Sequence, residues 1–242
     1  RLLLSHARDF TRSAESLGAD LSGDIAIGSF VTLAARFMPG LLAEFGRRVP
    51  RVSVSLEEGN QQEIMDGLTS GRLELALAYA YAVPDEILGE RLAELPPHIL
   101  VSADHRLADR SEISLKELAG EPFILLDLPF SRDYFFNLFL ACGAEPRIAY
   151  RSRSPELIRG LVAHGQGYTI HNALPGRDLS YDGRRISALA ISERPAPVHV
   201  VALRLRRQNM RPAVRLFADF MAEAFAPGGL FGLPSGMPAR PA

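Results

Sequence analysis

The sequence predicts an α/β fold made of two half-size units. From Gly23 onward, segments with strand-like apolar patterns alternate with segments whose apolar residues have helical spacing. Strands that alternate with helices indicate a parallel sheet covered by helices. The pair Pro96–Pro97 separates two such series, and small-molecule sites often lie between units of this kind. We therefore expect two α/β units with a ligand cleft between them.

The size and composition of the chain are compatible with this organisation. The chain has 242 residues, of which 47% are hydrophobic, enough for one large domain or two small ones. No apolar run is long enough for a transmembrane helix, and no N-terminal signal pattern is recognisable. The formal net charge of −1 provides no basic surface for nucleic acid. We therefore do not expect this chain alone to hold DNA well.

The first residues carry an apolar stripe with heptad spacing, which ends at Gly18. The stripe consists of Leu3, Ala7, Phe10, Ala14 and Leu17. It indicates either an ordinary amphipathic helix or the end of a longer, dimerising helix.

The first series of strands and helices begins at Asp24. Ile25 and Ile27 alternate with small or polar residues over 24–28, which is typical of a strand, and a helix over 32–47 follows without a loop. The remaining elements before the prolyl pair are a strand at 51–58, a helix at 60–71 and a strand at 73–80.

The second series contains two recognisable helix starts. Ser114 and Glu117 have the spacing of a capping box, and Ser154 is followed by Pro155, which is typical of a helix N-terminus. The expected helices are 114–120, 131–143, 154–165 and 212–225. The expected strands are 122–127, 147–152, 167–172, 184–191 and 198–205.

Signals of catalysis and of metal binding are weak in this sequence. No GxSxG, Walker or HExxH motif occurs, and the six histidines do not have metal-ligand spacing. Cys142 is the only cysteine, so we expect it to fill the core of a protein in a reducing compartment. We expect no enzyme activity, no metal and no cofactor.

Two expected helix starts carry hydroxyl groups directly after a strand. Thr32 with Leu33 follows the first strand, and Ser131 follows the strand at 122–127. Helix N-termini favour carboxylates or phosphates, so both are candidate anion sites, although each hydroxyl could instead be a simple N-cap. Arg132 could add a positive charge at the rim, or it could be an ordinary solvated arginine.

Further candidate ligand contacts follow the second and third strands. Asn60 opens a helix after the second strand, and Tyr79 and Tyr81 follow the third. We expect one of the tyrosines to line the ligand site, with packing in the core or at the sheet edge as the alternative.

Several segments together resemble the effector-binding part of LysR-type transcriptional regulators. Each match is loose, but their order and spacing agree with the family over about residues 1–226. The segments that carry the resemblance are 23–60, 68–77, 103–108, 114–126, 138–148 and 157–175.

The resemblance implies two Rossmann-like subdomains similar to type II periplasmic binding proteins, with the effector in the cleft between them. Regulatory subdomain I would comprise residues 21–95 and 198–227, and subdomain II residues 96–197. Residues 1–20 would be the end of a linker helix, and the winged helix-turn-helix head that precedes this helix is expected to be absent. Residues 228–242, rich in glycine and proline, would form a flexible tail.

The resemblance also implies effector contacts in this chain. They fall on Thr32, Leu33, Asn60, Phe130, Ser131 and His171. Most of these residues lie at the helix starts already selected, so we expect a small effector that carries a carboxylate. Phe130 is bulky and apolar, which suggests that the effector also has an aromatic or apolar part.

The function that we expect is that of the effector-sensing domain of a LysR-type regulator. Such a domain would be cytoplasmic and form a homodimer or homotetramer, with DNA bound only through the missing head and with no membrane partner. One alternative is the solute-binding protein of a transporter, and another is an enzyme on the same two-lobed fold. An upstream winged helix-turn-helix would favour the regulator, whereas a signal peptide would favour the solute-binding protein.

Overall fold

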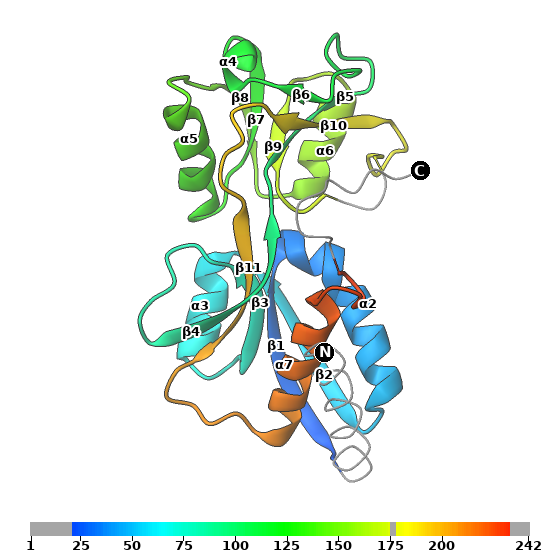
Figure 1. Ribbon diagram of the computed structural model, residues 1–242, viewed down its shortest axis with the longest axis vertical. Helices are drawn as coiled ribbons and strands as arrows, with labels where there is room; N and C mark the ends of the chain where they lie inside the picture. The colour runs from blue at the N-terminus through cyan, green and yellow to red at the C-terminus, as the bar shows by residue number, and fades with distance from the viewer. Residues whose placement is uncertain (1–20, 175–177, 233–242) are drawn as a thin grey trace. The chain divides into compact units, whose positions relative to one another are not determined.

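The computed structural model describes residues 21–174 and 178–232 and divides into two compact units (Figure 1). Unit 1 comprises the described residues up to Ala93 and those from His199 onward, and unit 2 comprises Glu94–Val198. The heptad stripe at residues 3–17 lies outside the described residues.

Unit 1 contains a five-stranded sheet with the strand order β2-β1-β3-β11-β4. Strands β1, β2 and β3 are parallel, as expected, and β11 runs antiparallel to β3. The strands are β1 (Gly23–Phe30), β2 (Val52–Gly59), β3 (Leu75–Tyr79), β4 (Ile87–Leu95) and β11 (Val198–Leu205).

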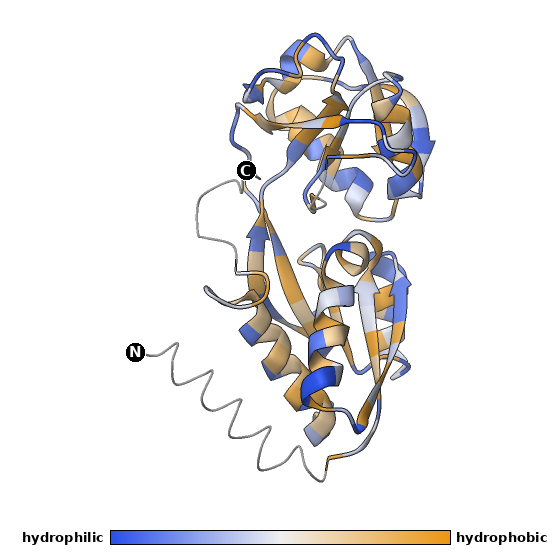
Figure 2. Ribbon diagram, turned by 90° about the vertical axis from the view of Figure 1, so that its right-hand side faces the viewer, coloured by the Kyte–Doolittle hydropathy of each residue, from blue (hydrophilic) through white to orange (hydrophobic). Residues whose placement is uncertain are grey.

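The helices of unit 1 are α2 (Val31–Arg48), α3 (Gln61–Thr69) and α7 (Pro212–Phe225). The chain moves from β1 outward to β2 through α2, and back past β1 to β3 through α3. Right-handed crossovers in these opposite directions place α2 and α3 on opposite faces of the sheet (Figure 1). Hydrophobic residues concentrate on the strands and on one stripe of the helices (Figure 2).

Aromatic rings hold α2 against α7. The Phe45 and Phe217 ring centroids are 4.8 Å apart, and those of Phe37 and Phe225 are 4.9 Å apart. Phe231 continues this cluster, since its ring lies 5.0 Å from that of Phe37. The first residues of the segment expected to be a flexible tail, 228–232, therefore pack on unit 1 because Phe231 finds an apolar surface there.

Unit 2 contains a four-stranded sheet, β6-β10-β5-β9, and a two-stranded parallel sheet, β7-β8. Its strands are β5 (His98–Ser102), β6 (Glu112–Ile113), β7 (Pro122–Leu126), β8 (Arg147–Ser152), β9 (Thr169–His171) and β10 (Ile186–Ile191). Its helices are α4 (Leu115–Leu118), α5 (Ser131–Ala141) and α6 (Pro155–Ala163).

The parallel direction expected from the alternation of strands and helices does not hold for β5. Strand β5 pairs antiparallel with both β9 and β10. These neighbours come much later in the chain, so no single crossover helix connects them to β5 and imposes the parallel direction.

In unit 2, the predicted N-caps of two helices are confirmed, whereas the predicted core position of Cys142 is wrong. Ser114 and Glu117 form the expected capping box of α4, and the Ser154 hydroxyl caps α6 ahead of Pro155. Cys142 is half-buried at the C-cap of α5 rather than in the core. The reason is that α5 ends one residue before it, at the boundary of the packed helix.

Candidate functional site

Three strands of unit 1 end at the same edge of its sheet, and two of them lead directly into helices. The register pairs Phe30 with Gly59 and Ser29 with Leu77, so β1, β2 and β3 finish side by side. We call the residues that follow these strand ends, Val31–Leu33, Asn60–Gln61 and Tyr79–Tyr81, the unit 1 edge. Helices α2 and α3 both begin there. The first-turn N–H groups of α2 receive no side-chain cap, whereas Asn60 caps those of Gln62 and Glu63 in α3.

Thr32 is not the N-cap of α2, because β1 runs into the helix without a loop and Phe30 occupies the cap position. Its hydroxyl instead forms a 3.0 Å hydrogen bond with the hydroxyl of Tyr79. Tyr79 is only 4% exposed, and its ring packs edge-on against Phe30 at 5.1 Å. Two hydroxyl groups from different elements therefore lie together at the unit 1 edge.

Leu33 does not offer its side chain to a ligand. The residue is fully buried, at 0% exposure, in the core under α2. Only its backbone N–H, in the first turn of the helix, remains as a donor for an anion.

Asn60 is the N-cap of α3 and forms a complete capping box. Its Oδ1 accepts hydrogen bonds from the N–H groups of Gln62 and Glu63, at 2.9 and 3.2 Å. Its own N–H donates to the Glu63 carboxylate at 2.8 Å. A ligand could therefore gain a side-chain hydrogen bond from Asn60 only through the amide Nδ2.

Gln61, which the sequence analysis did not select, is the polar residue most completely enclosed at this edge. Its side chain is 0% exposed, and Nε2 donates to the carbonyl oxygens of Tyr79 and Tyr81 at 2.9 and 3.0 Å. The Oε1 atom is buried and has no hydrogen-bond partner. A sequence signal existed, because Gln61 shares the helical stripe of Ile64 and Leu68 and so had to face the sheet.

In unit 2, Phe130 adopts a left-handed backbone conformation immediately before α5. Its φ is 65° and its ψ is −36°. The N–H of Ser131 donates to the carbonyl oxygen of Pro129 at 2.8 Å, which closes a γ-turn centred on Phe130. Turns of this hand are rare and strained, so α5 begins from a high-energy backbone conformation.

Ser131 and Arg132, the first residues of α5, differ in their surroundings. Ser131 is 3% exposed and does not cap the helix, because Phe130 holds the cap position. Arg132 is half exposed and lies 3.4 Å from the Asp127 carboxylate, which also pairs with Arg151 at 3.3 Å. The charge of Arg132 is thus already shared with an acidic neighbour.

His171 is a neutral, enclosed histidine at the end of β9. It is 5% exposed, and its Nε2 has no hydrogen-bond partner. Burial, with a smaller contribution from the nearby Arg159 charge, lowers the pKa of His171 to about 4. The ring is therefore uncharged at neutral pH and can act as a hydrogen-bonding group rather than as a cation.

Comparison with known proteins gives the family of this chain. The model of the LysR substrate binding domain matches residues 18–226. The chain belongs to this family. The transcriptional regulator YybE of Bacillus subtilis is 27% identical over 224 residues, which cover 90% of this chain and 75% of YybE.

Solved structures agree with the assignment to the LysR family. HinK, a LysR family transcriptional regulator from Pseudomonas aeruginosa, is 37% identical with a TM-score of 0.79, covering 90% of this chain and 77% of HinK. The effector binding domain of QuiR, solved in complex with shikimate, has a TM-score of 0.74 at 21% identity. The match covers 84% of this chain and 96% of the QuiR chain, and it shows that the two share a fold. These relatives are regulators, so the comparisons give no support to a transporter protein.

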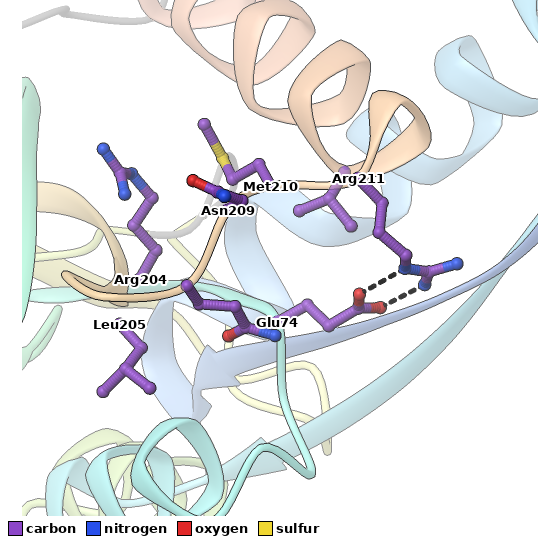
Figure 3. A pocket seen from close by; sticks show the side chains of 8 residues that line it. Glu74, Arg204, Leu205, Asn209, Met210 and Arg211 are labelled. Atoms are coloured by element: carbon purple, nitrogen blue, oxygen red, sulfur yellow. Dashed lines mark hydrogen bonds and ion pairs between the residues drawn. The ribbon is translucent and has the colours of Figure 1, made fainter.

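This LysR domain has a small cavity at the start of α7 (Figure 3). Glu74 and Arg211 line it and are joined by two hydrogen bonds, of 2.7 and 2.6 Å. Its volume of about 10 Å³ is that needed for one water molecule. None of the candidate ligand contacts lines this cavity, so we do not regard it as the effector site.

Within residues 21–174 and 178–232, no helix is long and apolar enough to cross a membrane. No group of three or more histidine, cysteine or acidic side chains is arranged to hold a metal ion there.

Proposed function

We propose that this LysR domain is the effector-sensing part of a cytoplasmic, DNA-binding transcriptional regulator and that it has no enzymatic activity. We further propose that it binds a small, carboxylate-bearing molecule at the unit 1 edge. The observation that carries the second proposal is the position of the paired hydroxyls of Thr32 and Tyr79 at the N-terminus of α2, which no side chain caps. The shikimate complex of QuiR, a fold-level relative, is consistent with an acid as the ligand class.

The unit 1 edge suits a carboxylate on electrostatic grounds. The first-turn N–H groups of α2, which no side chain caps, and the positive end of its helix dipole favour an anion, whereas the N-terminus of α3 is already occupied by the Asn60 oxygen and the Glu63 carboxylate. The hydroxyls of Thr32 and Tyr79, joined by a hydrogen bond, place two O–H groups, which can donate to an acceptor, beside this helix start. A carboxylate oxygen is the acceptor that gains most from such donors.

Phe130, Ser131 and His171 of unit 2 remain predicted ligand contacts, on the strength of the family resemblance. Ser131 is tested separately by Ser131→Ala. Its matched control is Ser102→Ala, another buried serine of unit 2, whose hydroxyl donates to the Ala163 carbonyl oxygen at 3.2 Å.

The proposed site is tested by thermal shift and calorimetry with benzoate, shikimate and succinate as probes. A probe at 100 times its dissociation constant should stabilise the domain by about 2.7 kcal/mol. For a probe that binds, Thr32→Val should weaken binding about 10- to 100-fold, because a hydrogen bond to a charged group is lost.

Thr69→Val is the matched control for Thr32→Val. Thr69 is the last residue of α3 and so lies at the end of this helix away from the unit 1 edge. Its hydroxyl donates to the Met65 carbonyl oxygen. The control should bind like the wild type. If Thr32→Val stays folded and also binds like the wild type, the carboxylate is held elsewhere.

We also propose that the regulator acts as a homodimer or homotetramer and contacts DNA through a segment outside this domain. The support is the heptad stripe at residues 3–17 and the family membership. Light scattering at tens of micromolar should give at least twice the monomer mass of 26.5 kDa. A monomer at this concentration would contradict the dimer.

A further inference from the structure

We propose that Gln61 restricts the effector to acids that also carry a hydrogen-bond donor, such as a hydroxyl or an N–H group. This inference rests on the proposed function, because it assigns a second chemical requirement to the same site. The requirement comes from one atom, Gln61 Oε1, which is buried and without a hydrogen-bond partner at the N-terminus of α3.

The orientation of the Gln61 amide is fixed by its neighbours. Both of its N–H groups are used, because Nε2 donates to the carbonyl oxygens of Tyr79 and Tyr81. A rotated amide would instead place Oε1 against these two acceptors, which is repulsive. The oxygen therefore points away from the segment 79–81 and offers an acceptor that the protein leaves unused.

This acceptor is chemically opposite to the rest of the unit 1 edge. The N-terminus of α2 and the hydroxyls of Thr32 and Tyr79 attract an acceptor, whereas Gln61 Oε1 repels a carboxylate and attracts a donor. A simple monocarboxylate satisfies only the first requirement. A hydroxy acid, an amino acid or a carboxylic acid that also carries an amide N–H satisfies both.

A buried acceptor without a partner also makes the selection strong. When a ligand lacks the donor, its binding leaves the buried acceptor of the protein unpaired, which is costly. Such a site distinguishes ligands with and without the donor better than a site that relies on apolar fit.

The test compares the three hydroxybenzoates with their methoxybenzoate counterparts by calorimetry. The methoxy group keeps the carboxylate and an acceptor oxygen and removes the donor. It also adds one methyl group, and Gln61→Met shows how much that added size weakens binding without the Gln61 amide. In the wild type, the best hydroxybenzoate should bind about 10- to 100-fold more tightly than its methoxy counterpart. In Gln61→Met, which keeps the length but removes the amide, the two should bind within about twofold of each other.

Gln62→Met is the matched control, because Gln62 is exposed on the same helix and its amide donates only to Asp66, at 2.9 Å. It should keep the full preference for the hydroxybenzoate. Should Gln61→Met fail to fold, the wild type is compared with the fluorobenzoates, which lack the donor and add no methyl group, and binding equal to that of the hydroxybenzoates would overturn the proposal.

The outcomes separate the two proposals. Equal binding of hydroxy and methoxy acids by the wild type overturns the role of Gln61 and leaves the carboxylate site standing. A preference that persists in folded Gln61→Met also overturns that role. If benzoate, shikimate and every substituted benzoate fail to bind, the proposed effector site is wrong, and the inference falls with it.

Discussion

At the scale of single residues, the buried histidine of β9 makes stability depend on pH. The pKa of His171 is about 4 in the folded chain, against an ordinary value of 6.5, mainly because burial disfavours the charged ring. Between these two values the unfolded chain binds a proton that the folded chain does not. The free energy of unfolding should therefore fall as the pH falls from 6.5 to 4, by about 3 kcal/mol from this residue.

Urea unfolding between pH 7.5 and 4.5 measures this dependence. His171→Gln should lose most of it, because the replacement does not titrate. His164→Gln is the control, since His164 is exposed and pairs with Asp182 at 2.7 Å, and it should keep the wild-type fall. Equal pH dependence in the wild type and His171→Gln would assign the effect to another group.

The γ-turn before α5 predicts an unusual order of stability among substitutions. At Phe130, with a φ of 65°, Phe130→Gly should be more stable than Phe130→Ala by about 1 kcal/mol, because only glycine adopts this backbone without strain. Both variants lose the same ring, so their difference isolates the backbone. Thermal unfolding of the two proteins provides the measurement.

Phe136, a half-buried residue inside α5, is the matched control for this pair. There the order should reverse, with Phe136→Gly less stable than Phe136→Ala by about 1 kcal/mol, because glycine is unfavourable within a helix. Finding alanine preferred at both positions would mean that the turn relaxes and stores no strain.

At the scale of elements, the sequence predicted the helices and most strands but not β4, β5 or β6. It also predicted the caps of α4 and α6 but not that of α2. The helix expected at 32–47 is Val31–Arg48, and the strand expected at 24–28 is Gly23–Phe30. Thr32 was a candidate N-cap because hydroxyl residues are preferred there, yet the direct strand-to-helix junction places Phe30 at that position. Such a junction is set by where the sheet pairing ends, which depends on the neighbouring strand.

The charged pair Glu74–Arg211 fastens the start of α7 to the sheet of unit 1. Glu74 Oε2 also accepts from the N–H of Ala26 at 3.2 Å, and Arg211 donates to the Asp24 carbonyl oxygen at 2.7 Å. Glu74→Gln should lower the free energy of unfolding by about 1–2 kcal/mol at pH 7, less than for a buried pair because Arg211 is half exposed.

The pH dependence of the same variant provides a second check. The hydrogen bond from Arg211 is the main cause of a lowered Glu74 pKa in the folded chain, so this stabilisation is present above the unfolded value of 4.5. It should be lost as the pH falls below that value, and the two proteins should then converge. Glu57→Gln, which breaks the exposed pair with Arg72, should cost less than about 0.5 kcal/mol.

At the scale of the whole molecule, the α/β class followed from the sequence, whereas the strand directions in unit 2 and the unpartnered oxygen of Gln61 did not. Alternation of strands and helices is a local signal, but β5 pairs with β9 and β10, which are distant in the chain. Gln61 is defined by the carbonyl groups of β3 and the loop after it. Periodicity alone could place Gln61 against the sheet but could not reveal that its oxygen has no partner.

The charge of the whole chain predicts its behaviour toward nucleic acid. With 27 basic and 28 acidic side chains, the domain has no excess positive charge with which to release counterions from DNA. Many of its arginines are also neutralised locally, as Arg211 is by Glu74 and Arg132 is by Asp127. In fluorescence anisotropy at 150 mM salt, this chain should show no sequence-specific binding to duplex DNA up to about 10 µM. Submicromolar, salt-sensitive binding to a defined site would show that the domain itself reads DNA, and the proposed contact through a segment outside it would have to be abandoned.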